Sequence, residues 1–352
     1  MTPLLRWRSA AAAAVALILA LSASRADDTA DFYRGRQIDL IVGNSPGGGY
    51  DVYARLLARH MGQYIPGNPN VVVQNMPGAG GLRAANYIYS VAPKDGSAFG
   101  LFARDIALVG LIGGNPNVQF DPRKFTWLGS SSSYVNDGYM LFVRKDAAVQ
   151  SIEEARRPGS PPLVLGGSAE GASGDDVPVL LRDLLGLHIK LIAGYRDSSV
   201  LFIAVDRKEV DGRTVGLSAV RSAHPQWLGP NSDMRVLVQF ARKTRLPEFP
   251  DVPTARELAP DDRSRALIEL AELPYYLSRP FAAPPDVPPA RAKVLQTAFL
   301  AAQRDRQYLE EAEKLKVDIS PISGEDILQA IDGMAKTPSE LREALRNLLA
   351  QK

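Results

Sequence analysis

Cysteine is absent from the 352-residue sequence. Disulfide bonds, thiolate metal sites and a lipid-anchored N-terminal cysteine are therefore excluded. A folded chain of this size must rest on its hydrophobic core alone, which is common among proteins of the bacterial periplasm. Histidine is scarce as well. His60, His188 and His224 lack the spacing of metal ligands, and each is better interpreted as a satisfied or solvent-facing side chain.

The sequence also lacks a strong excess of charge of either sign. Its formal charge is +2, and residues 1–26 contribute three arginines and no acid. This segment has a basic start, a short apolar run and small residues at Ser24 and Ala26, which predicts a signal peptide cleaved before Asp27. An uncleaved anchor is the alternative. Cleavage would change the charge from +2 to −1, and such a periplasmic protein would have no electrostatic basis for binding nucleic acid.

A catalytic constellation is missing too. The stretch "GGSAEG" (166–171) misses the nucleophile-elbow pattern of hydrolases by one position. Paired acids such as Asp175-Asp176 and Glu310-Glu311 are typical of solvated helix surface. We therefore expect no enzyme, no cofactor and no metal site.

What the sequence does contain is an alternation of strand-like and helix-like segments, which predicts an α/β protein with a mostly parallel sheet. The strand-like runs are 38–42, 71–74, 98–103, 139–143, 162–166, 189–193, 214–218 and 235–240. Helices are expected at 51–64, 82–91, 174–186 and 198–207, and a long one near 290–315. A capping box at 337–340 predicts a last helix with an apolar stripe.

Glycine gathers where the first strand meets the first helix, in "GNSPGGGYDVYARLL" (43–57). Bare backbone at Gly47-Gly48-Gly49, followed by a helix N-terminus, can bind a phosphate or a carboxylate. The stretch fits neither the dinucleotide fingerprint nor the P-loop. A tight turn capped by Asp51 is the structural alternative.

Two further loops repeat this arrangement of strand, glycine-rich loop and helix. They are "MPGAGGL" (76–82) and "GGSAEGASGDDVPVLL" (166–181), with Ser173 as a plausible N-cap. Because open α/β sheets bind ligands beyond the carboxyl ends of their strands, three such loops favour a ligand cleft lined by helix N-termini.

These segments resemble the substrate-binding receptors of tripartite tricarboxylate transporters, the Bug or TctC family. The resemblance rests on Pro46–Asp51, on Asn75–Gly81 with the following 92–96, and on "FPDVPTARELAP" (249–260). Segments 164–176 and 193–212 also look like those of the family's second domain. The match covers essentially the whole chain after residue 26.

The resemblance implies a two-domain, type 2 periplasmic-binding-protein-like α/β fold that closes on a small carboxylate, held largely by main-chain amides. Domain 1 would be 27–130 and 236–352, and domain 2 would be 131–235. The protein would be a monomer serving the membrane components of a transporter. The candidate ligand-binding residues are Ser45, Pro46, Gly47, Gly48, Gly49, Tyr50, Asp51, Gly78, Ala79, Gly80, Gly81, Arg104, Ser168, Ala169, Gly171, Ala172, Ser173 and Gly174.

The sequence departs from the family pattern near these loops. Asn44 and Ser45 replace an apolar pair, and Tyr50 stands where serine or threonine is usual. Arg104 and Asp105 replace uncharged residues, either as a specificity element or as a partly exposed salt bridge at the cleft rim. The identity of the ligand is therefore not determined by the sequence. A sensor receptor for a carboxylate and an exported α/β hydrolase are the alternative functions.

Overall fold

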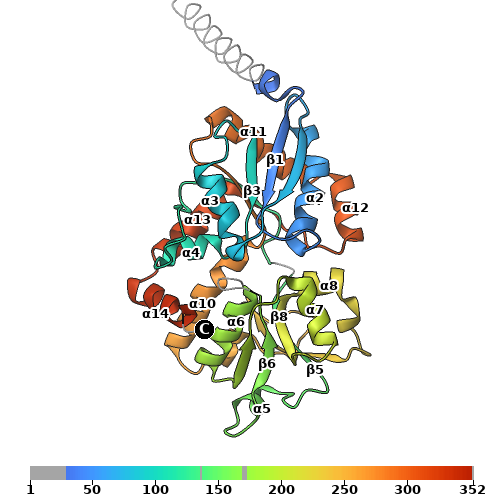
Figure 1. Cartoon of the computed structure of the whole chain (residues 1–352), viewed down its shortest axis with the longest axis vertical. Helices are drawn as coiled ribbons and strands as arrows, with labels where there is room; N and C mark the ends of the chain where they lie inside the picture. Colours follow the sequence, from blue (N-terminus) through green and yellow to red (C-terminus); the bar gives the residue numbers. More distant parts are fainter. Residues whose placement is uncertain (1–28, 135–136, 169–172, 351–352) are drawn as a thin grey trace, which may run out of the picture.

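The computed structural model describes residues 29–134, 137–168 and 173–350. The expected signal peptide and the expected ligand residues Ala169, Gly171 and Ala172 lie outside this part of the chain. The described chain forms two lobes, each built on one sheet, above and below one another in Figure 1. No described helix is both long enough and apolar enough to cross a bilayer.

The first lobe is built on a six-stranded sheet in the order β11-β4-β10-β3-β1-β2. Its strands are β1 (Gln37–Val42), β2 (Asn70–Asn75), β3 (Ala98–Leu101), β4 (Thr126–Ser130), β10 (Pro280–Ala283) and β11 (Ile322–Ser323). β1 pairs in parallel with β2 and β3, whereas β10 and β11 pair antiparallel. The carboxyl ends of β3, β1 and β2 therefore meet at one edge.

The helices of the first lobe pack around this sheet and against each other. They are α2 (Gly49–Met61), α3 (Leu82–Ser90), α4 (Ile106–Ile112), α11 (Pro289–Ala302), α12 (Arg306–Lys314) and α13 (Gly324–Ala335). Tyr53, Leu56 and Leu57 of α2 are buried, as its amphipathic spacing predicts.

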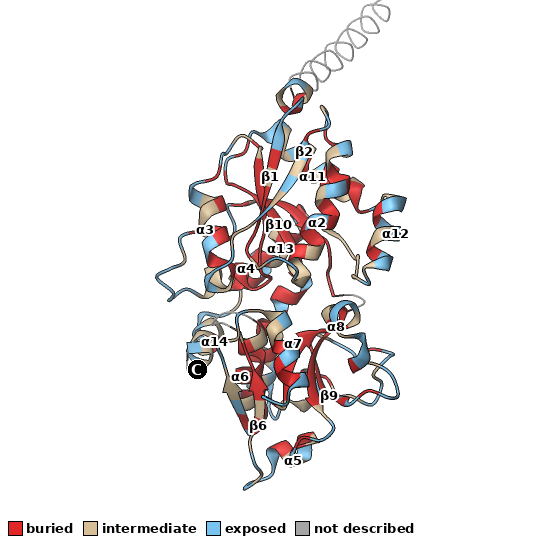
Figure 2. Cartoon of the chain, turned by 45° about the vertical axis from the view of Figure 1, so that its right-hand side comes forward, coloured by how far each residue is buried: buried red, intermediate tan, exposed pale blue. Residues whose placement is uncertain are grey.

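The second lobe is built on a five-stranded sheet in the order β7-β6-β8-β5-β9. Its strands are β5 (Tyr139–Arg144), β6 (Leu163–Gly166), β7 (Ile189–Ile192), β8 (Gly212–Gly216) and β9 (Met234–Phe240). The parallel trio is β7, β6 and β8. Buried residues fill the central strands of both sheets in Figure 2, whereas the edge strand β2 has only exposed and half-buried residues.

Helices of the second lobe follow its strands, and two later helices lie close to it. They are α5 (Ile152–Arg156), α6 (Ser173–Leu185), α7 (Ser198–Asp206), α8 (Leu217–Ala223), α9 (Ala255–Leu258) and α10 (Asp262–Glu272). The last helix, α14 (Ser339–Ala350), contacts α6 and α10 and also α4 of the first lobe.

Several sequence expectations need correction. The sheets are mixed rather than mostly parallel, because five of the nine described strand pairs are antiparallel. The long helix near 290–315 is two helices, since Asp305 caps α12 by accepting a hydrogen bond from Tyr308 N at 2.9 Å. The expected domain boundary at 235/236 falls inside β9, which pairs with β5 of the second sheet.

Candidate functional site

The glycine-rich loops of the first lobe meet because their strands are parallel neighbours. The loop after β1 (43–48) and the loop after β2 (76–81) touch: a Cβ on Gly43 would lie 3.2 Å from Gly81 Cα. Gly81 itself has φ +97°, a left-handed conformation that favours glycine. The segment after β3 brings Arg104 and Asp105 to the same edge.

A cavity of about 280 Å³ lies between this edge and the loops after β6, β7 and β8 of the second lobe. Both lobes therefore contribute to its walls. Most of the candidate ligand residues line it: Ser45, Pro46, Gly48, Gly49, Tyr50, Gly78, Ala79, Gly80, Gly81, Arg104, Ser168, Ser173 and Gly174. Gly47 and Asp51 do not.

Helix α2 presents its first turn to this cavity. The first helical hydrogen bond runs from Val52 N to Gly48 O at 3.1 Å, so the N–H groups of Gly48, Gly49 and Tyr50 precede the helical ladder. The helix dipole adds a partial positive charge at the same place. This end of α2 can hold an anionic group of a small ligand.

Two glycines of this loop, Gly47 and Gly48, have different structural roles. Gly47 has φ +80°, and this positive φ requires glycine there. Gly48 has φ −80°, an ordinary extended value, and a Cβ on it would meet only Ser45 O, at 3.6 Å. A side chain at Gly48 would therefore cost cavity space rather than backbone strain.

Asp51 holds the loop rather than the ligand. Its carboxylate is buried and accepts hydrogen bonds from Gly47 N at 2.9 Å, Arg55 Nε at 2.8 Å and Asn75 Nδ2 at 2.9 Å. Burial alone would raise the pKa of Asp51, but these hydrogen bonds outweigh it and lower the pKa. Asp51 thus fixes the loop conformation in which the first turn of α2 faces the cavity.

The expected partly exposed salt bridge between Arg104 and Asp105 is wrong. Arg104 is 5% exposed, and its guanidinium lies 4.8, 5.2 and 4.7 Å from the ring centroids of Tyr134, Tyr139 and Tyr275. Its Nη1 donates to the Tyr134 hydroxyl. Among the described residues, a cage of tyrosines surrounds this cation and no carboxylate forms a direct ion pair with it.

Asp105 instead contacts the second lobe, where Ser173 Oγ donates a hydrogen bond to Asp105 Oδ2 at 2.8 Å. Burial, reinforced by the nearby charge of Asp176, raises the pKa of Asp105 to about 6. Since β5 carries Tyr139, both members of the Arg104-Asp105 pair link the two lobes directly beside the cavity.

The sequence did not point to Arg213 and Arg279, which line the same cavity from opposite lobes. Arg213 lies in β8 and Arg279 directly precedes β10. The one signal for each was an arginine bordering an apolar run, in "GRTVG" and "SRPFAA". An arginine beside an apolar run is also common at exposed strand ends. Neither arginine could therefore be assigned to a ligand site from the sequence.

His60 and His188 have hydrogen-bond partners, as expected, whereas His224 has a buried Nδ1 without a described partner. His60 Nε2 lies 2.8 Å from Glu311 Oε2, His188 Nδ1 lies 2.8 Å from Ser160 O, and His224 stacks on Phe202. Within residues 29–134, 137–168 and 173–350, no group of three or more acidic, histidine or cysteine side chains is placed to hold a metal ion.

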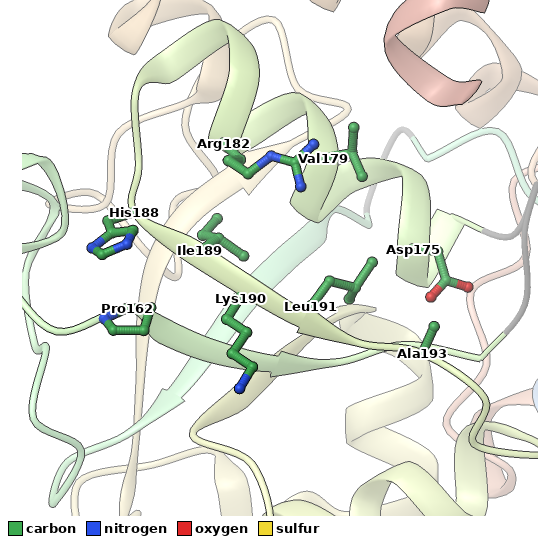
Figure 3. A pocket seen from close by; sticks show the side chains of 9 residues that line it. All are labelled: Pro162, Asp175, Val179, Arg182, His188, Ile189, Lys190, Leu191 and Ala193. Carbon is green, nitrogen blue, oxygen red and sulfur yellow. The ribbon is translucent and has the colours of Figure 1, made fainter. Parts of the chain in front are cut away.

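A larger cavity of about 570 Å³ runs along β7 and α6. Figure 3 shows its walls extending from His188 and Pro162 at one end to Asp175 and Ala193 at the other. Glycine-rich loops and helix N-termini do not converge on it, so the cleft between the lobes is the better candidate site.

Comparison with known proteins agrees with this architecture. No protein-family model matches the chain. A UPF0065 protein of Bordetella pertussis is 25% identical over 335 residues, which is 91% of each chain. The protein BugT of the same organism is 44% identical over 70 residues, 20% of this chain and 21% of BugT.

Solved structures give the same fold. The periplasmic binding protein BugD has a TM-score of 0.68 at 19% identity, covering 90% of this chain and 98% of BugD. The chain therefore has the fold of BugD. MatC from Rhodopseudomonas palustris with bound malate has a TM-score of 0.64 at 19% identity (88% and 99% covered), and R. palustris Rpa4515 with adipate has 0.67 at 20% identity (90% and 98% covered).

Proposed function

We propose that this chain is a periplasmic solute-binding protein that captures a small organic carboxylate for a transporter of the tripartite tricarboxylate type. The observation that carries the proposal is the cleft between the lobes, where the first turn of α2 faces a cavity of about 280 Å³. Helix N-termini and bare backbone amides bind carboxylates. A cavity of this volume suits a small acid rather than a cofactor or a polymer.

The relatives add independent support. Malate is bound in the MatC structure and adipate in that of Rpa4515, and both ligands are small organic carboxylates. The expected export signal would place the mature protein in the periplasm. BugD is likewise described as a periplasmic binding protein. The membrane components of the transporter would be the partners, and a sensor receptor would use the same cleft.

Chemistry on the ligand forms no part of the proposal. Ser168 and Ser173 line the cleft, but Ser173 Oγ donates its hydrogen bond to Asp105 Oδ2 at 2.8 Å and is not paired with a histidine base. The three histidines that could act as bases have partners outside the cleft. This arrangement fits binding and release.

A thermal-shift screen of organic acids tests the proposal directly. At a free concentration one hundred times Kd, a ligand stabilises the folded state by about 2.7 kcal/mol. Gly48→Val should abolish this shift, because its side chain occupies the space in front of the N–H groups while the backbone tolerates it. Gly333→Val, in α13 with open space around it, is the matched control and should bind normally.

Two results would contradict the proposal. The first is a protein that no acid stabilises. The second is a folded Gly48→Val variant, verified by circular dichroism, that binds an acid as tightly as the unmodified chain.

A further inference from the structure

Two arginines on opposite walls of the cleft are almost fully buried. Arg279 is 3% exposed and Arg213 is 4% exposed. In each of them Nε is buried and has no hydrogen-bond partner. Among the described residues neither guanidinium forms an ion pair with a carboxylate. Both side chains therefore carry a positive charge without a direct ion pair at the wall of the cavity. The nearest carboxylates act only at longer range: those of Asp175 and Asp197 on Arg213, and that of Asp137 on Arg279.

Arg279 lies behind the first turn of α2. Its guanidinium stacks at 4.6 and 4.9 Å from the ring centroids of Tyr50 and Tyr53. Nη1 donates to the carbonyl and hydroxyl oxygens of Ser278, whereas Nη2 points to the loop and would lie 3.8 Å from a Cβ on Gly49. The charge of Arg279 thus adds to that of the α2 N-terminus.

Arg213 is held against the start of α7 on the other wall. Its Nη1 donates to Ser198 O at 2.7 Å and its Nη2 to Ser198 Oγ at 3.0 Å, and the guanidinium lies 4.6 Å from the Phe202 ring centroid. Burial lowers the pKa of Arg213 to about 10, which leaves it charged at neutral pH. Neutral oxygens and a ring hold the guanidinium in place, and the charges of Asp175 and Asp197 offset only part of the effect of burial on its pKa.

Burying an ion costs several kcal/mol unless a partner of opposite charge compensates for it. Each lobe carries this cost at the wall of the same cavity. A ligand with one acidic group could compensate one guanidinium fully, or lie between both. A ligand with two acidic groups would compensate both when the lobes close on it.

We propose that Arg279 and Arg213 determine the specificity of the cleft for ligands with two acidic groups, one held by Arg279 and the α2 N-terminus and the other by Arg213. This inference rests on the proposed function and goes beyond it, since capture of a carboxylate by backbone amides alone would require neither arginine. It also predicts that the second acidic group joins the two lobes.

Matched pairs of acids test the inference on the unmodified protein. The probes are succinate and butyrate, glutarate and pentanoate, and adipate and hexanoate, where the members of each pair have the same number of carbons. Calorimetric titration should show that the best dicarboxylate binds at least roughly thirtyfold more tightly than its monocarboxylate, the lower range for truncating one partner of a buried charge pair.

Two arginine variants then test which arginine binds which acidic group of the ligand. Arg213→Met should weaken the best dicarboxylate by a similar factor and leave its monocarboxylate unchanged, because the latter binds at Arg279. Arg279→Met should weaken both acids. Methionine fills a similar space, and replacing a buried charge by an apolar side chain is often neutral for stability. Arg306→Met removes an exposed arginine on α12 and should change neither affinity.

The outcomes separate the two proposals. If none of the six acids binds, both the proposed function and this inference fail. If acids bind but mono- and dicarboxylates bind equally well, or if Arg213→Met lowers both affinities alike or neither, the inference alone is overturned.

Discussion

Replacing Asp105 with asparagine is expected to stabilise the ligand-free protein at neutral pH, although it removes a charged group from a hydrogen bond. The pKa of Asp105 rises from 3.8 to about 6 in the folded protein. Each pKa unit corresponds to about 1.4 kcal/mol. Keeping this buried carboxylate ionised above pH 6 therefore costs the folded state up to about 3 kcal/mol.

The sign of the pH dependence follows from the direction of this change. Between pH 4 and 6 the folded protein binds more protons at Asp105 than the unfolded chain, so the stability due to this group falls as pH rises. Asparagine does not titrate and its amide oxygen can still accept the hydrogen bond from Ser173. The variant and the unmodified protein should have similar stability near pH 4 and diverge up to pH 7.

Urea unfolding followed by circular dichroism at several pH values measures the difference. Asp51→Asn is the matched control, because hydrogen bonds outweigh burial and lower the pKa of Asp51. Its stabilising contribution is present at neutral pH and is lost as pH falls through the folded pKa, so this variant should be less stable at pH 7 and recover in acid. Parallel stability curves for Asp105→Asn and the unmodified protein would refute the account of Asp105.

Three further outcomes are expected. Saturating ligand should reduce the radius of gyration in small-angle scattering, since both lobes line the cleft; an unchanged radius alongside a clear thermal shift would contradict closure. Arg104→Met should lower the free energy of unfolding by roughly 1–2 kcal/mol, because three tyrosine rings surround the cation; unchanged stability would show that the cage contributes little. The intact mass of the exported protein should correspond to a chain starting at Asp27, and retention of Met1 would contradict cleavage.

Much of the fold could be predicted from the sequence because its signals are local. The run 38–42 and the helix that follows Gly49 lie where apolar spacing and glycine indicate them. β4, β10 and β11 could not be found in this way. β11 has only two residues and β10 starts at a proline, and all three strands depend on pairing with distant segments of the chain.

The glycine-rich loops were visible in the sequence because a bare backbone at a strand-to-helix junction has a direct local reason. The roles of charged residues were not visible, since they depend on burial. Arg104 was expected as a specificity element or in a partly exposed pair, and only the tertiary structure surrounds it with Tyr134 and Tyr139 from one segment and Tyr275 from another. The same folding leaves Arg213 and Arg279 without a direct ion pair among the residues that the structure describes. Local sequence thus determined where bare backbone lies at a strand-to-helix junction. The burial of Arg213 and Arg279 at the wall of the cavity was decided only by the tertiary structure, because it brings together segments that are distant in the sequence.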